Sequence, residues 1–174
     1  MSHWGGVLAS AVLVAGCVAW RAPAIPETIR APTNERLAHT AHAKGVQIYQ
    51  CLALKDDPSK GEWAFQGPDT ELFSNAALSD PIGKLTAGPT WEASDGSTVT
   101  GAIKGASPAP DPASVRWLLY AAASTAGSGL FSNVSSIQRV DTVGGRPPPG
   151  HCSKNQLQAT IRVPYTATFH FYTR

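Results

Sequence analysis

The sequence has few charged residues and no excess of either sign. Lys and Arg number 14 against 12 Asp and Glu, the formal net charge is +2, and charged residues make up 15% of the chain. Proteins that bind nucleic acid through its phosphates present a concentrated basic surface. This composition offers none, so we expect no nucleic-acid partner.

The chain also lacks an apolar run long enough to cross a membrane. Its most apolar stretch, residues 5–19, has about 15 residues, whereas a spanning helix needs roughly 20. A short apolar stretch at the N-terminus is typical of a cleaved signal peptide. We expect residues 1–16 to be a signal peptide, although only His3, and no Lys or Arg, precedes the apolar stretch.

Cys17 ends this stretch in the pattern of a bacterial lipoprotein signal, VLVAGC. Cleavage before Cys17 would leave a thiol to carry lipid, so the mature protein would be membrane-anchored and face an oxidising compartment. The residue after Cys17 is Val18 and not Asp. In a Gram-negative cell, lipoprotein sorting would then send the protein to the outer membrane, where it faces the periplasm. The alternative is ordinary cleavage after residues 22–24 and a secreted, soluble protein.

The remaining chain divides into a tether and one domain. Residues 17–32 contain three prolines and no apolar periodicity, which predicts a flexible, extended tether. Residues 33–174 have the usual size of a single domain. At its start, residues 33–44 are expected to form a short helix, because Thr33 or Asn34 can cap it and Gly45 can end it.

Glycine and proline separate short runs of aromatic and β-branched residues through this domain. The chain has 16 Gly and 14 Pro, and such spacing is typical of proteins with many short strands. The expected strands are residues 46–54, 63–66, 90–94, 97–100, 115–123, 134–143 and 159–172. The predicted fold is all-β, an antiparallel sandwich or flattened barrel, with one short N-terminal helix.

The clearest hairpin pattern surrounds Asp95 and Gly96. This dipeptide tolerates the two positive φ angles that a two-residue type I′ turn requires. Such a turn places Trp91 opposite Thr100, and the next residue, Glu92, opposite Val99.

Two cysteines, Cys51 and Cys152, remain after Cys17. In an oxidising compartment they are expected to pair, because no third thiol competes. A bridge closing a loop of roughly 100 residues is worth up to about 4.7 kcal/mol in the chain-entropy model, and we expect it to join the first strand to the last. The alternative, a reactive Cys152 with His151 as its base, is disfavoured because neighbouring residues in an extended chain point to opposite faces.

The strongest candidate site consists of Trp91, Glu92, Asp95 and Arg139. Two carboxylates and a guanidinium can serve acid–base roles or hold a cation, and Trp91 could stack on a ligand. In the predicted register, however, Glu92 and Asp95 face opposite sides of the hairpin, and the turn alone explains Asp95. We therefore expect these residues to bind a ligand and expect no catalytic residue.

Two histidines were considered as metal ligands. His39 and His42 lie three residues apart on the expected helix, where a metal could bridge them. Two ligands without a third do not make a site, so no metal and no other cofactor is expected.

Several short motifs occur in a characteristic order. They are VQIYQC at 46–51, WAF at 63–65, GPTWE at 88–92, DGS at 95–97, WLL at 117–119, SIQRV at 136–140, GG at 144–145, Cys152 and VPYTA at 163–167. In order and spacing they resemble the DUF3455 family, secreted or surface proteins of bacteria and fungi without an established activity. The resemblance covers residues 46–172 and implies that Cys51 and Cys152 are the family's two cysteines. It implies no chemistry, and residues 84–86 replace a histidine that members often carry there.

These features predict a lipid-anchored cell-envelope protein that is a non-catalytic binding domain or a structural component. Its partners would be the membrane, through lipid on Cys17, and a small molecule or glycan bound around residues 88–101. The alternative is an enzyme of unknown reaction that uses Glu92, Asp95 and Arg139. A cavity bringing these three side chains together would favour the enzyme, and their separation on a packed sheet would favour the binding domain.

Overall fold

The computed structural model describes Met1 and residues 24–174. Residues 2–16 of the expected signal peptide, the expected lipidation site Cys17 and the first part of the expected tether lie outside the described residues. Within the part of the chain that is described, no helix is long and apolar enough to cross a membrane.

The described chain is all-β, as predicted, and forms one antiparallel sheet of nine strands. In chain order the strands are β1 (Arg36–Ala53), β2 (Lys60–Phe73), β3 (Pro81–Thr86), β4 (Thr90–Ala93), β5 (Thr98–Ser107), β6 (Trp117–Ala126), β7 (Ser136–Gly144), β8 (Cys152–Ser153) and β9 (Thr160–Thr173). The strand order is β1-β9-β7-β6-β5-β4-β3-β2-β8, and β1 also pairs with β2. The pairings therefore return to the starting strand, which leaves the sheet with an inner and an outer face.

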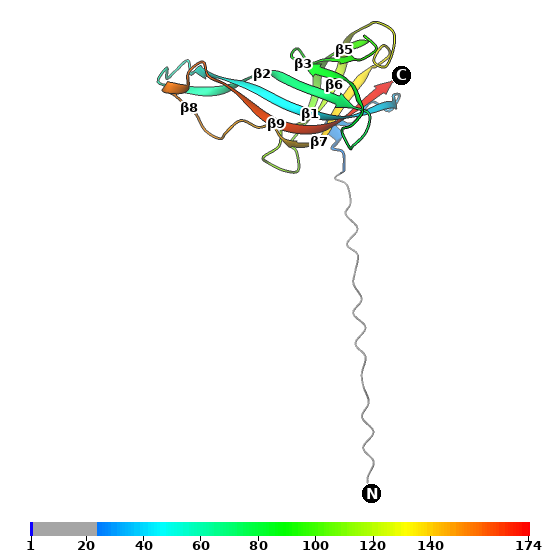
Figure 1. Cartoon of the computed structure of the whole chain (residues 1–174), viewed down its shortest axis with the longest axis horizontal. Coiled ribbons are helices and arrows are strands. Elements are labelled where there is room, and N and C mark those ends of the chain that lie inside the picture. The colour runs from blue at the N-terminus through cyan, green and yellow to red at the C-terminus, as the bar shows by residue number, and fades with distance from the viewer. Residues whose placement is uncertain (2–23) are drawn as a thin grey trace.

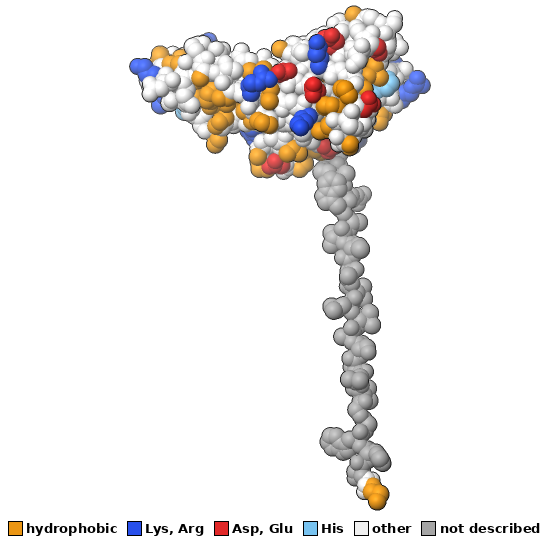
Figure 2. Space-filling view, viewed as in Figure 1, with side chains coloured by type: hydrophobic (Ala, Val, Ile, Leu, Met, Phe, Trp, Pro, Cys, Tyr) orange, Lys and Arg blue, Asp and Glu red, His pale blue; other side chains and the backbone are white. Residues whose placement is uncertain are grey.

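The molecule is elongated (Figure 1). The end of β1, the start of β2 and the start of β9 continue past the other strands as an arm, and β8 lies at its tip. The face in Figure 2 shows acidic and basic side chains intermixed, in keeping with the small net charge of +2.

Aromatic side chains fill the inner face of the sheet. Trp91 is fully buried, and its ring lies edge-on to those of Tyr120 and Phe169, with centroids 5.1 and 5.6 Å away. Phe131 stacks on Phe171 at 4.6 Å. Burial of each large apolar side chain contributes about 1.5–3 kcal/mol, so this cluster accounts for much of the stability of the domain.

The last strand follows its predicted alternation. Tyr165, Ala167, Phe169 and Phe171 of β9 are all buried, because side chains two residues apart share a face. Pro164, a residue type that favours a sheet edge or a bulge, lies one residue beyond the last pairing of β9 with β7. From there towards the start of β9 only β1 pairs with the strand, so no sheet hydrogen bond with β7 is lost at the proline.

The helix predicted at residues 33–44 is wrong. Residues from Arg36 onward belong to β1, which pairs with β9 on one side and with β2 on the other. Ala41 and Ala43 are buried on its inner face, and Gln47 and Tyr49 continue the same alternation. Helix propensity and capping residues are weak local preferences, and they are outweighed here by pairing with β9, which β2 joins from His42 onward.

The tether ends earlier than predicted, because residues 25–29 pack on the sheet. A short 3-10 helix, η1 (Glu27–Ile29), places Ile29 against Trp117, Leu119 and Val140 on the outer face, and Ile29 is fully buried. The Gln138 side-chain amide donates a hydrogen bond of 2.7 Å to the Ile29 carbonyl oxygen. This segment is therefore part of the folded domain.

The hairpin exists between β4 and β5, but its predicted register is wrong by one residue. Trp91 lies opposite Val99, and Glu92 lies opposite Thr98. The reason is a three-residue turn, in which the Ala93 amide donates to the Ser97 carbonyl oxygen at 2.9 Å and Gly96 takes φ +84°. A one-residue shift exchanges the two faces of a strand, which places Trp91 and Val99 together in the core.

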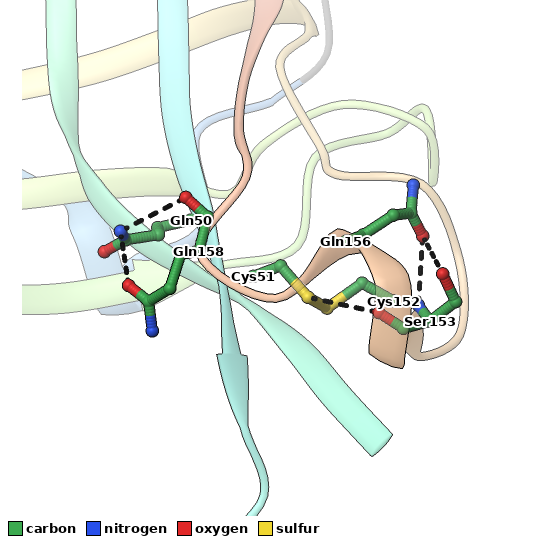
Figure 3. Close-up of a disulfide and its surroundings, with 6 residues drawn as sticks. All are labelled: Gln50, Cys51, Cys152, Ser153, Gln156 and Gln158. Atoms are coloured by element: carbon green, nitrogen blue, oxygen red, sulfur yellow. Dashed lines mark hydrogen bonds between the residues drawn. A yellow bond between two sulfur atoms is a disulfide. The ribbon is translucent and has the colours of Figure 1, made fainter. Parts of the chain in front are cut away.

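The predicted disulfide between Cys51 and Cys152 is confirmed, with Cα atoms 6.1 Å apart (Figure 3). It joins β1 to the short strand β8, and not to the last strand. A second 3-10 helix, η2 (Lys154–Gln156), follows directly, and the Gln156 side-chain oxygen accepts hydrogen bonds from the Ser153 amide and hydroxyl at 2.9 and 3.0 Å. The bridge therefore fastens the tip of the arm.

Candidate ligand-binding site

The structure separates the four residues of the predicted ligand site. The Trp91 side chain is fully buried among core aromatics, where no ligand can stack on it. Glu92 lies on the outer face and forms a salt bridge of 3.3 Å with Lys84 on β3. Asp95 lies in the hairpin turn, and Arg139 lines a cavity.

Asp95 has a structural role in the turn. Its carboxylate accepts hydrogen bonds from the Ser97 hydroxyl and amide at 2.6 and 2.8 Å and from the Leu130 amide at 2.8 Å. These bonds, that of the Ser97 hydroxyl most of all, lower the pKa of the Asp95 carboxyl. They also attach the loop after β6 to the hairpin.

The two histidines that were weighed as metal ligands, His39 and His42, are separated as well. His39 and His42 lie on β1, where an odd spacing places side chains on opposite faces of the strand. Among the residues that the structure describes, no cluster of three His, Cys, Asp or Glu could hold a metal ion. The Cys152 thiol proposed as a nucleophile is bonded to Cys51.

A cavity of about 370 Å³ lies on the inner face of the sheet and is lined mainly by residues in or next to β1, β2, β5, β6 and β7. This volume falls within the range of small-molecule sites. We call it the Arg139 cavity. Apolar and aromatic side chains form most of its wall, namely Tyr49, Phe65, Leu85, Val115, Leu118 and Tyr120.

Two large apolar side chains are exposed in the lining of the cavity. Phe65 is 54% exposed and Ile103 is 61% exposed. The Phe65 ring packs at a tilt against Tyr49, with centroids 5.6 Å apart, and the Tyr49 hydroxyl donates a hydrogen bond of 2.8 Å to the Gly145 carbonyl oxygen. Phe65 and Ile103 therefore mark the mouth, while Tyr49 belongs to the buried wall.

The charges of the cavity lining have one sign. Arg116, Arg139 and Arg146 contribute to it, and no Asp or Glu does. Arg116 and Arg146 are exposed to solvent, whereas Arg139 is 8% exposed. Arg139 is therefore the innermost of the three cations.

The position of Arg139 follows from strand alternation in β7. Ile137 points into the core, so Arg139, two residues later, points to the same face. Its cross-strand neighbours are Leu118 on β6 and Phe169 on β9. The Nε and Nη2 atoms donate to the Arg116 carbonyl oxygen at 3.3 and 2.8 Å, and no carboxylate among the described residues pairs with the guanidinium.

Gln47 adds a second polar group to the same wall. It lies on β1, is 2% exposed, and its side-chain nitrogen makes no hydrogen bond of normal geometry to the described residues. It lies near the Tyr165 hydroxyl: burial raises the pKa of the Tyr165 phenol, and the Thr70 and Gln47 side chains act in the opposite direction. Tyr120 lines the same cavity as Arg139. Burial raises the pKa of the Tyr120 phenol, and the positive charge of Arg139 acts in the opposite direction. The cavity thus combines apolar walls with one unsatisfied buried donor and a guanidinium that has no carboxylate partner among the described residues.

The sequence model of the DUF3455 family, whose description is 'protein of unknown function', matches residues 32–173. The chain belongs to this family. No curated protein and no solved structure matches the chain. The DUF3455 match contains both disulfide cysteines and every residue that lines the Arg139 cavity.

Only Arg139 of the predicted site lies at the cavity of this DUF3455 domain. The sequence motifs contain Gln47, Tyr49 and Phe65 but do not indicate that these residues form a site. The strands that bring them to Arg139 are far apart in the sequence. One available indication was polarity in an inward-facing position, which Gln47 and Arg139 both show.

Proposed function

We propose that this protein is a non-catalytic binding protein of the cell envelope, anchored by lipid on Cys17. Two arrangements were predicted, a sandwich and a flattened barrel, and we propose that the domain is the flattened barrel. The Arg139 cavity holds a small, mainly apolar molecule. One observation carries this proposal: an apolar-walled cavity of about 370 Å³ at whose mouth Phe65 and Ile103 are exposed. Exposed apolar side chains around a concave site are typical of ligand-binding surfaces.

The enzyme alternative receives no support from the geometry. Glu92 pairs with Lys84, Asp95 is held by backbone amides, and Arg139 lies in the cavity without either carboxylate. An acid–base pair must reach one substrate atom within hydrogen-bond distance, and these groups do not share a site.

Binding can be tested with an uncharged fluorescent probe, N-phenyl-1-naphthylamine. We expect saturable binding with one site per chain. Replacing both Phe65 and Ile103 by Ser should weaken binding about tenfold, because the probe loses apolar contact at the mouth. The matched control replaces Leu37 and Val143, which are 52% and 63% exposed away from the cavity, by Ser. Unsaturable binding, or equal weakening in both double variants, would contradict the proposal.

The anchor is tested separately in the cells that produce the protein. We expect wild-type protein in the membrane fraction and Cys17→Ser in the soluble fraction, and the intact mass of the mature wild type should exceed that of the bare polypeptide by the attached lipid. A mature chain without lipid would contradict the anchor and leave the binding proposal untouched.

A further inference from the structure

The structure points to the chemical class of the ligand, an inference that rests on the proposed function. We propose that the Arg139 cavity binds an apolar molecule with a carboxylate head group, such as a medium-chain fatty acid. The head group pairs with the Arg139 guanidinium and accepts a hydrogen bond from the Gln47 amide. The tail lies along Tyr49 and Leu118 towards the mouth.

The first argument is the unpaired charge of Arg139. An arginine stays protonated in proteins, so burial cannot be relieved by loss of the proton. Arg139 is 8% exposed, lies between Leu118 and Phe169, and within the described chain is hydrogen-bonded only to the Arg116 carbonyl oxygen. A buried charge without a counter-ion is costly, and an anionic ligand supplies the counter-ion that the described chain does not.

The second argument is independent and comes from Gln47. Its side-chain nitrogen is buried in the lining of the same cavity and makes no hydrogen bond of normal geometry to the described residues. The nearby Tyr165 hydroxyl is already hydrogen-bonded to the Thr70 hydroxyl at 2.8 Å. Unsatisfied buried donors are rare in native proteins and call for an explanation. An acceptor oxygen of the ligand would satisfy both Gln47 and Arg139, and a carboxylate provides two such oxygens in the planar geometry that arginine binds best.

The third argument concerns what surrounds the head group. Arg116 and Arg146 add positive charge to the lining, which contains no Asp or Glu. Apolar walls keep the local dielectric low and strengthen this field. A neutral ligand of the same shape would fill the walls but leave the Arg139 guanidinium unpaired in a space without water.

The test compares decanoate with decanol, which share a chain and differ in charge. Each is titrated at pH 7.5 against wild-type protein loaded with N-phenyl-1-naphthylamine, and displacement is measured. We expect decanoate to displace the probe at a concentration at least tenfold lower than decanol. Arg139→Met should remove this preference, Arg139→Lys should keep part of it, and Gln47→Leu should weaken decanoate several-fold while leaving decanol unchanged. Arg36→Met, an exposed arginine away from the cavity, is the matched control and should behave as wild type.

The outcomes separate the two proposals. Equal displacement of the probe by decanoate and decanol from the wild type would overturn the carboxylate assignment and leave the apolar binding function intact. Failure of the probe itself to bind would overturn the proposed function. If Arg139→Met does not fold, as judged by circular dichroism, the wild-type preference and its response to Gln47→Leu still decide the matter.

Discussion

Leu118 of β6 lies directly opposite Arg139 of β7, so a permanently charged group occupies an inward position beside a core leucine. Nearby, Tyr49, Val115 and Tyr120 provide walls that would suit an apolar side chain at this place. The chain thus keeps a cation where folding alone favours a hydrophobic residue. Such a conflict between packing and polarity is expected at functional sites.

Stability should therefore rise when this charge is removed. We expect Arg139→Met to increase the free energy of unfolding of the unliganded protein by about 1–3 kcal/mol, because an apolar side chain of similar length needs no counter-ion. Urea denaturation of wild type and variant measures the difference, with Arg36→Met as the surface control. A loss of stability of similar size would show that the hydrogen bonds to the Arg116 carbonyl oxygen outweigh the burial of the charge.

The disulfide should contribute strongly to stability. Replacing Cys51 and Cys152 by Ala is expected to lower the free energy of unfolding by about 2–5 kcal/mol. Denaturant titrations with and without reductant provide the measurement, and reductant should leave the double variant unchanged. Wild-type protein that is equally stable with and without reductant would contradict this expectation.

Gly61 on β2 should tolerate no side chain while the bridge is present. A Cβ atom built on Gly61 would lie 2.6 Å from the Cys152 sulfur and 2.7 Å from the Cys51 sulfur, closer than packed atoms approach. We expect Gly61→Ala to destabilise the protein by about 1–3 kcal/mol, and by clearly less where both cysteines are Ala. A double-mutant cycle measures this coupling. Equal effects in the two backgrounds would place the clash elsewhere.

The docked N-terminal segment should depend on Gly105. A Cβ atom on this β5 residue would collide with the carbonyl oxygen of Thr28. We therefore expect Gly105→Val to release residues 25–29 and expose Trp117, on which Ile29 packs. Hydrogen exchange of this segment should accelerate, whereas Ala102→Val, an exposed change on the same strand, should have no effect. Unchanged exchange in Gly105→Val would contradict the close packing.

His170 on β9 should make stability depend on pH. Burial lowers the pKa of His170 below 6.5, the negative charge of Asp141 opposes this, and His42 adds to it. A histidine with a lowered pKa binds its proton more readily when unfolded, so stability is complete above about pH 6.5 and falls as the pH decreases towards the folded-state pKa. The loss between pH 7.5 and 5.5, measured by urea denaturation, should be smaller in His170→Gln. An identical loss in both proteins would refute this assignment.

Local alternation predicted β9 well, because each inward residue from Tyr165 to Phe171 is large or apolar and the pattern needs no knowledge of neighbouring strands. The start of β1 was mistaken for a helix, since its inward residues, such as Ala41 and Ala43, are small and its burial depends on β9. Residues that pair across distant strands carry no local indication of their partner.

The candidate site could be predicted only in part, again because its residues come from strands that are far apart in the sequence. Arg139 lines the cavity, whereas Trp91, which was expected to stack on a ligand, is fully buried in the core. The companion of Arg139 in the cavity, Gln47, lies on β1 and is separated from β7 by β9 in the sheet. Strand order brings such side chains from distant parts of the chain to one wall, and a single sequence does not display strand order.

The docking of Ile29 on the outer face sets an upper limit on how far the domain can stand from a bilayer. With lipid on Cys17, eight residues span the distance to Ile25, where the docked segment begins, and fully extended they reach only about 27 Å. That reach is shorter than the thickness of a single lipid bilayer. An anchored domain would therefore work close to the lipid head groups, where amphiphilic molecules are most concentrated.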